Sequence, residues 1–113
     1  MGEADLRVLL ERHVELFNEA VLSGDYDDFV ATFASDAVVK FDGLPIGPFQ
    51  GRPAIAHAYA SQPPMDTMAL MAMETDGDDA VRVSFDWDNT GGGGQMYLRW
   101  RGRELAELVV AFA

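Results

Sequence analysis

The stretch "SGDYDDFVATFASDAVVKFDG", residues 23–43, changes from a helical period to an alternating one partway along. Tyr26, Phe29 and Phe33 lie three and four residues apart after the stop signal of Gly24, which predicts a short helix. The second half then alternates apolar and polar side chains, which is typical of a half-buried strand. A helix followed directly by a strand begins the pattern of a mixed α+β domain.

The rest of the chain extends this pattern on both sides. Apolar residues recur at helical spacing from Leu6 to Val21, which predicts a first helix. The loop at 43–52 carries two prolines and three glycines, and Pro53 then suits the first turn of a third helix ending near residue 61. Strands are predicted over residues 35–43, 68–76, 80–88, 95–101 and 104–113.

The predicted element order is α-α-β-α-β-β-β-β, with three helices packed on one face of a curved, mostly antiparallel sheet. A chain of 113 residues has room for one domain, so residues 1–113 are treated as one. The segment 104–113 is apolar on both faces, which predicts a central strand whose outer face a dimer partner covers. The glycine run at 91–94 is expected to be a flexible hairpin tip, because no Lys-Ser or Lys-Thr follows it as in a phosphate loop.

Charge narrows the range of partners. Nineteen acidic residues against eight basic ones give a net charge of −11, which disfavours nucleic acid, anionic membranes and strongly anionic substrates. The expected partner is therefore a neutral, largely apolar small molecule. The chain has no cysteine, and its two histidines show no metal-binding spacing, so neither a metal nor another cofactor is predicted.

The N-terminus, "MGEADLRVLL", lacks the basic start and long apolar run of a secretory signal. No apolar stretch approaches the ~20 residues that span a bilayer. The sequence therefore predicts a cytoplasmic protein.

The element order, together with residues 23–43, "FQGRPAI" at 49–55 and "YLRWRGRELAEL" at 97–108, resembles the SnoaL-like and ketosteroid-isomerase-like proteins of the nuclear transport factor 2-like (NTF2-like) superfamily. The resemblance covers nearly the whole chain. It implies a cone in which the sheet wraps the helices around a deep apolar pocket, and a homodimer formed through the open sheet face. Function is less constrained, since such proteins include isomerases, cyclases, dehydratases and members that only bind or scaffold.

The resemblance also assigns the positions of the isomerase groups. The hydrogen-bonding Tyr corresponds to Phe17, the proton-shuttling Asp to Phe41 and the oxyanion-binding Asp to Met96. None of these three side chains accepts a proton or donates a hydrogen bond to an oxyanion. A standard ketosteroid isomerase mechanism is therefore excluded.

His13 and Asp42 are the remaining candidates for an acid or base. His13 lies one helical turn before Phe17, so its imidazole can reach the same cavity and is expected to titrate near pH 6 to 7. Asp42 shares a strand face with Lys40 and turns inward only if a bulge or Gly43 breaks the alternation. Otherwise it is a solvated residue entering a turn.

Three further polar residues have more limited roles. Tyr59 on the third helix is a candidate hydrogen-bond donor that orients a ligand. Arg52 is expected to anchor the loop to an acidic neighbour or to cap backbone carbonyls. His57 is expected on the surface of the third helix.

The first hypothesis is a small-molecule-binding protein with an apolar pocket, acting as a cofactor-independent proton-transfer enzyme of isomerase, cyclase or dehydratase type. The alternative is a non-catalytic ligand-binding or dimeric assembly module. The expected pocket-lining side chains are Phe17, Phe33, Phe41, Phe49, Tyr59, Trp87, Met96 and Trp100.

Overall fold

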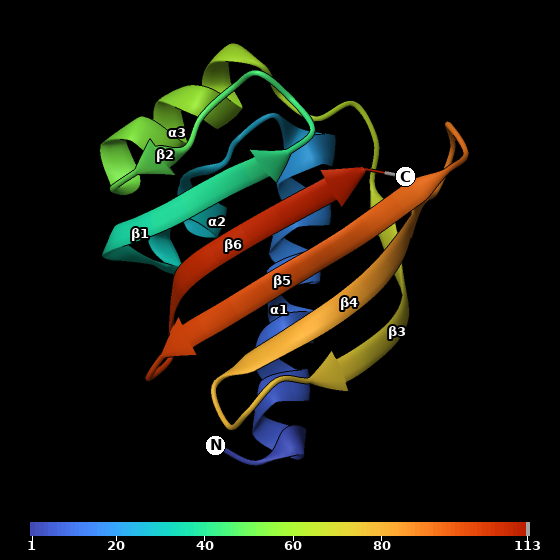
Figure 1. Cartoon of the computed structure of the whole chain (residues 1–113). Helices are drawn as coiled ribbons and strands as arrows, with labels where there is room; N and C mark the ends of the chain where they lie inside the picture. The colour runs from blue at the N-terminus through green and yellow to red at the C-terminus, as the bar shows by residue number, and fades with distance from the viewer. Residues whose placement is uncertain (113) are drawn as a thin grey trace.

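Three helices lie against one face of a six-stranded sheet in the computed structural model of the chain, which describes residues 1–112 (Figure 1). The α+β class is confirmed, and so is the predicted element order apart from one short additional strand, β2. Along the chain the elements are α1 (Glu3–Ser23), α2 (Asp27–Ala31), β1 (Phe33–Asp42), β2 (Phe49–Gln50), α3 (Arg52–Ser61), β3 (Met68–Thr75), β4 (Ala80–Trp87), β5 (Gly93–Arg101) and β6 (Glu104–Phe112).

α1 lies behind the sheet and crosses the strands at an angle (Figure 1). Its apolar stripe faces the strands, with Leu6, Leu10 and Phe17 buried, because residues three and four apart share one face of a helix. The helix ends as predicted at Gly24, whose backbone adopts φ +79° and donates its N–H to the Ala20 carbonyl. The shorter α2 begins at Asp27 and packs Phe29 into the core.

The strand order is β2-β1-β6-β5-β4-β3. β1 and β6 are parallel and the other neighbouring pairs are antiparallel. β6 is therefore a central strand, as its two apolar faces predicted. Register shifts interrupt β1, β3 and β5, and such bulges increase the local twist and curvature of a sheet. The curved sheet wraps the helices (Figure 1).

The strand predicted at 80–88 is confirmed as β4, and its side chains alternate between the two faces of the sheet. Val81, Val83 and Phe85 are buried against the helices, whereas Arg82 and Asp86 are exposed on the outer face. The same alternation holds on β5 and on the second half of β1. These strands fix which side chains face the interior.

Two local predictions need correction. Residues 43–52 were predicted to be a loop, but Phe49 and Gln50 within it pair with Val39 and Val38 to form β2. Phe33 begins β1 instead of extending the second helix.

The glycine run is also only partly a hairpin tip. Gly91 and Gly92 turn the chain with positive φ, whereas Gly93 and Gly94 belong to β5. A Cβ added at Gly93 would lie 1.9 Å from the Phe85 carbonyl oxygen, so the close approach of two strands requires glycine there. The last residue of the predicted strand 104–113 lies outside the described residues.

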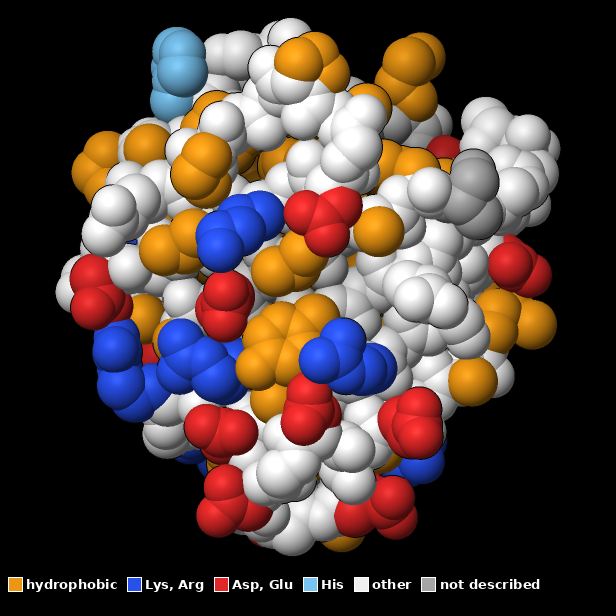
Figure 2. Space-filling view, viewed as in Figure 1, with side chains coloured by type: hydrophobic (Ala, Val, Ile, Leu, Met, Phe, Trp, Pro, Cys, Tyr) orange, Lys and Arg blue, Asp and Glu red, His pale blue; other side chains and the backbone are white. Residues whose placement is uncertain are grey.

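The outer face of the sheet, on the side away from the helices, carries several ion pairs. Glu107 on β6 lies between Lys40 at 3.8 Å and Arg99 at 3.5 Å, and Arg82 pairs with Asp76 at 3.0 Å. Figure 2 views this face and shows basic and acidic side chains side by side around exposed hydrophobic groups. No helix within residues 1–112 combines the length and apolar character needed to cross a membrane.

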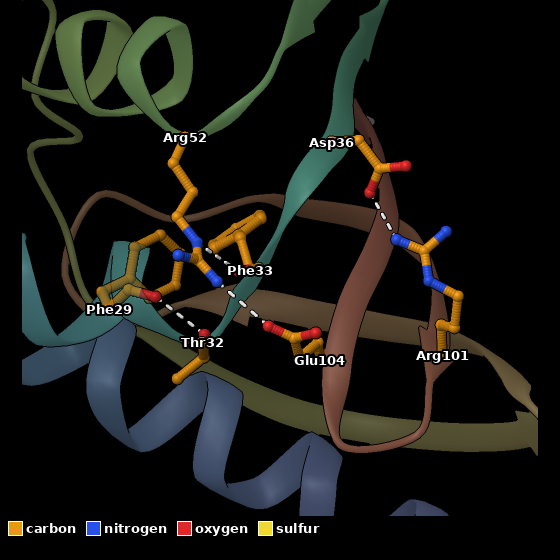
Figure 3. Close-up of polar contacts among 7 residues, drawn as sticks. All are labelled: Phe29, Thr32, Phe33, Asp36, Arg52, Arg101 and Glu104. Carbon is orange, nitrogen blue, oxygen red and sulfur yellow. Dashed lines mark hydrogen bonds and ion pairs between the residues drawn. The ribbon is translucent and has the colours of Figure 1, made fainter.

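Arg52 ties α3 to the sheet, as expected for this loop (Figure 3). Its Nε donates a hydrogen bond of 2.7 Å to the Phe33 carbonyl, and its guanidinium also pairs with Glu104 at 3.0 Å. Arg101 at the end of β5 pairs with Asp36 near the start of β1, at the same end of the sheet (Figure 3). The start of α3 is thereby fixed relative to the starts of β1 and β6.

Candidate ligand-binding cavity

A cavity of about 630 Å³ lies between the helices and one end of the curved sheet. α1 contributes His13 and Phe17 to its wall, β1 contributes Phe41, and the ends of β4 and β6 contribute Trp87 and Phe112. The loop before β2, the second half of α3 and the segment before β3 complete it. The volume is within the range of sites that bind small organic molecules.

Aromatic rings follow one another around the wall. Phe49 packs edge-on against Phe41 at 6.2 Å between ring centroids, and Phe41 stacks on Phe112 at 6.5 Å. Phe112 stacks on Trp87 at 6.3 Å, and Trp87 lies 6.5 Å from Phe17 on α1. These contacts join β2 to α1 across the sheet and place a row of aromatic rings in a largely apolar wall.

The three positions that the resemblance assigns to the isomerase groups all lie on this wall. Phe17, Phe41 and Met96 each line the cavity. Their side chains are hydrocarbon or thioether, so the wall has neither an ionisable group nor a hydrogen-bond donor at these points.

His13 is the buried polar side chain that α1 places on the cavity wall. It is 5% exposed and packs against Phe29 and Phe33, with ring centroids 5.1 and 6.2 Å away. Its Nδ1 has no hydrogen-bond partner among the described residues. Burial lowers the pKa of His13 to about 4, because desolvation disfavours the imidazolium. The titration expected near pH 6 to 7 is therefore wrong, and the ring is neutral at pH 7.

Tyr59 occupies the wall from α3. It is buried, stacks on Tyr26 at 5.4 Å and packs edge-on against Phe29 at 5.1 Å. Burial, with a contribution from Tyr26, raises the pKa of the Tyr59 hydroxyl. The group therefore stays protonated and keeps its capacity to donate a hydrogen bond.

His13 and Tyr59 lie at the same end of the cavity. Both rings contact Phe29, each at 5.1 Å, and Phe29 is itself buried beneath them. We call His13, Phe17 and Tyr59 the floor of the cavity. The mouth lies where Leu44, Met65 and Phe112 line the cavity while remaining exposed to solvent.

The structure does not bring Asp42 to the cavity. Phe41 pairs with Val110 and Asp42 with Ala111, so the alternation continues to the end of β1 and the carboxylate lies exposed on the outer face. Gly43 turns the chain only after this point, with φ +85°. Neither a bulge nor Gly43 turns Asp42 inwards, so the prediction that Asp42 acts as a base in the cavity is wrong.

Six of the eight expected lining residues are on the cavity wall. Phe33 and Trp100 are not, although both are buried on the inner face. Phe33 lies at the start of β1 and Trp100 near the end of β5, where Trp100 lines a separate recess of about 50 Å³. The six on the wall are Phe17, Phe41, Phe49, Tyr59, Trp87 and Met96, and their part in binding a ligand stays a prediction.

Sequence reasoning missed Asp66, a carboxylate that lines the cavity from the segment between α3 and β3. It is 6% exposed and accepts hydrogen bonds from Thr67, Asn89 and Thr90. Desolvation opposes its ionisation, but the hydrogen bonds from Asn89 and Thr90 outweigh this and hold the pKa of Asp66 well below its usual range. The stretch "QPPMDTM" gives no signal of such a role, because Asn89 and Thr90 are more than twenty residues away along the chain.

His57 is exposed on α3, as expected, and also borders the cavity. Within residues 1–112, no group of three His, Asp or Glu side chains is placed to hold a metal ion.

A helix-backed, curved sheet that closes around a largely apolar cavity at one end defines a cone-shaped α+β protein of the NTF2-like class. The chain belongs to the SnoaL-like family, since the family model described as a SnoaL-like domain matches residues 11–109.

Solved structures support the fold. The epoxide hydrolase/cyclase-like enzyme SalBIII, described for pyran ring formation in the polyether salinomycin, aligns with a TM-score of 0.78 and 15% identity over 98% of this chain and 92% of its own. A protein named as a ketosteroid isomerase from Kribbella flavida gives 0.73 and 16% over 95% and 76%. One named as a polyketide cyclase from Sinorhizobium meliloti gives 0.68 and 21% over 88% and 93%. A search of curated proteins finds no match.

Proposed function

We propose that the protein binds a neutral, largely apolar small molecule in its cavity, with the polar end of the ligand on His13 and Tyr59. One observation carries this: two buried polar side chains lie on the floor of a cavity whose walls are mostly apolar. The Nδ1 atom of His13 has no hydrogen-bond partner among the described residues. A ligand with a carbonyl or hydroxyl group would supply the missing partner.

Charge supports a neutral ligand. The two polar side chains of the floor, His13 and Tyr59, are uncharged at pH 7, because burial lowers the pKa of His13 and raises that of Tyr59. The ionised Asp66 on the wall and the net charge of −11 both oppose an anion. A charged ligand would lose its hydration without gaining a counter-ion at the floor.

Proton transfer on such a ligand is the chemistry that the floor supports. A neutral His13 can accept a proton from a ligand carbon or hydroxyl group, and the Tyr59 hydroxyl can donate a hydrogen bond to an adjacent oxygen. This corresponds to an isomerase, cyclase or dehydratase without a cofactor. The enzyme SalBIII, a cyclase-like structural neighbour, supports this reading at the level of fold.

A specific observation favours the alternative of a non-catalytic binding or assembly module. The three isomerase positions are occupied by Phe17, Phe41 and Met96 on the wall, and a His13 with a pKa of about 4 is a weak base. The proposed dimer would form through the outer sheet face, where β6 presents Val109 beside charged neighbours.

Three probes of matched shape test the binding proposal. Calorimetry would compare 2-acetylnaphthalene with 2-isopropenylnaphthalene, which replaces the carbonyl oxygen by a methylene group, and with the anion 2-naphthoate. The ketone is expected to bind about tenfold more tightly than the alkene, which is typical of one net hydrogen bond, and the anion least tightly. No detectable binding of the three probes would contradict the proposal.

The variants Tyr59→Phe and His13→Phe identify the groups responsible. Each is expected to reduce the preference for the ketone while leaving affinity for the alkene nearly unchanged. Tyr97→Phe removes the same hydroxyl from the outer face and should leave the preference intact. An enzyme would show a rate that rises through about pH 4 and is lost in His13→Phe. A pH-independent affinity with no turnover of any ketone or alcohol would favour the binding module.

A further inference from the structure

Asp66 receives five hydrogen bonds in a position where the chain has no regular structure. Its Oδ1 accepts from the Thr67 backbone N–H at 2.9 Å and from the Asn89 side-chain amide at 2.8 Å. Its Oδ2 accepts from the backbone N–H groups of Asn89 and Thr90, at 2.9 and 2.8 Å, and from the Thr90 hydroxyl at 2.9 Å. Both oxygens are therefore occupied by protein donors, so Asp66 is not available to a ligand as a base.

The donors belong to the connection between β4 and β5. Asn89 and Thr90 follow Trp87, and Gly91 and Gly92 come next with positive φ. The Trp87 N–H donates to the Gly92 carbonyl at 2.9 Å and closes the turn. The carboxylate of Asp66 connects this turn to the segment before β3 through the hydrogen bonds from Asn89 and Thr90.

This connection forms one wall of the cavity. Asp66 and Thr90 line the cavity directly, and Trp87 lies on the same wall. A second pair of contacts joins the same two segments, because Thr67 donates its hydroxyl to Asp88 and its carbonyl accepts the Asp88 backbone N–H at 2.9 Å.

We propose that Asp66 is a positioning residue that holds the Trp87–Thr90 wall in the geometry that binds a ligand. The predicted effect on affinity rests on the proposed binding function. The predicted effect on the geometry of the wall does not depend on that function. A carboxylate is required because it offers two acceptor oxygens, whereas an amide offers one. In Asp66→Asn, the amide nitrogen would face backbone N–H groups that cannot accept a hydrogen bond, either that of Thr67 at the Oδ1 position or those of Asn89 and Thr90 at the Oδ2 position.

The decisive experiment compares Asp66→Asn with Asp86→Asn. Asp86 is on the same hairpin and has the same charge, but its side chain is exposed on the outer face. In the Trp100→Phe background, Trp87 is the single fluorescent indole, and its steady-state anisotropy reports wall mobility without any ligand. Asp66→Asn is expected to lower this anisotropy, to accelerate amide exchange at Asn89 and Thr90, and to weaken 2-acetylnaphthalene binding about tenfold.

Asp86→Asn should leave all three readouts within twofold of the parent. The preference for the ketone over the alkene should survive in Asp66→Asn, because the floor is untouched. A lower melting temperature with unchanged anisotropy, exchange and affinity would show a merely structural role and overturn the inference.

The two proposals fail in different ways. If the parent protein binds no probe, the proposed function fails, while anisotropy and exchange still decide whether Asp66 holds the wall. If Asp66→Asn does not fold, Thr90→Val removes a single hydrogen bond and should give a smaller change in the same direction. Unchanged anisotropy and affinity in Thr90→Val would then count against the inference.

Discussion

Asn18 forms two hydrogen bonds with the backbone of Met68. Its Nδ2 donates to the Met68 carbonyl at 3.0 Å, and its Oδ1 accepts the Met68 N–H at 2.9 Å. Fifty residues separate the two along the chain, so this side chain joins α1 to the first residue of β3. β3 is the last strand of the sheet, and Asn18 supplies the hydrogen bonds that a further neighbouring strand would make with Met68.

Replacing Asn18 by Ala is expected to lower the free energy of unfolding by about 2 kcal/mol, because the Met68 N–H and carbonyl lose their partners. The higher helix propensity of Ala offsets a few tenths of this. Urea unfolding measures the difference. Glu19→Ala, at the next and exposed position, is the matched control and should change stability by less than about 0.5 kcal/mol.

Stability should fall in acid because of His13. The native pKa of about 4 lies below the ordinary value of 6.5, so the unfolded chain binds a proton that the native state resists. The stabilising effect is fully present above pH 6.5 and is lost as pH falls towards 4. Between pH 7.5 and 4 the loss should be about 3 kcal/mol, since a tenfold change in proton affinity equals about 1.4 kcal/mol.

His13→Phe should remove this part of the pH dependence, as measured by urea unfolding at both pH values. His57→Phe, at an exposed position on α3, should retain it. Equal slopes in the parent and in His13→Phe would contradict the prediction.

The two halves of the glycine run should differ in their tolerance of a methyl group. Gly91→Ala must adopt φ +77° in open space, which costs about 1 kcal/mol. Gly93→Ala places its Cβ against the Phe85 carbonyl and should cost several times more, because two paired strands must separate. Thermal unfolding of both variants tests the order, and equal costs, as expected if residues 91–94 were a uniform flexible tip, would contradict the prediction.

Arg52→Lys should destabilise the protein by about 1 kcal/mol even though it keeps the charge. The guanidinium bonds the Phe33 carbonyl and Glu104 at once, and an ammonium on a flexible stem cannot reproduce this fork. Glu104→Gln, which keeps the Phe33 contact, should cost less because the ion pair is exposed. Urea unfolding of the two variants would refute the prediction if the Glu104 change were the larger.

Sequence periodicity predicted which side chains face inwards but not how far along the cone they lie. Phe33 and Trp100 have the same inward orientation as Phe41 and Met96, yet they are at the opposite end of their strands from the cavity. Depth depends on strand register and on where the sheet curves, and both are set by long-range pairing.

The polar part of the site was less predictable. His13 was identified because helical spacing relates it to Phe17, which is a local signal. Asp66 was not, because Asn89 and Thr90, which donate four of its five hydrogen bonds, lie 23 and 24 residues away. The acidity of His13 also depends on the complete burial that Phe29 and Phe33 provide, which no single helix reveals.

The pairing of β1 with β6, which is far along the chain, affects how the protein folds during its synthesis. A nascent chain that has emerged only as far as β5 contains two blocks of strands with no hydrogen bonds between them. Until residues 104–112 leave the ribosome, β1 and β5 each expose an unpaired edge that can associate with other chains. The interval before the last strand is synthesised is therefore the time of greatest risk of aggregation.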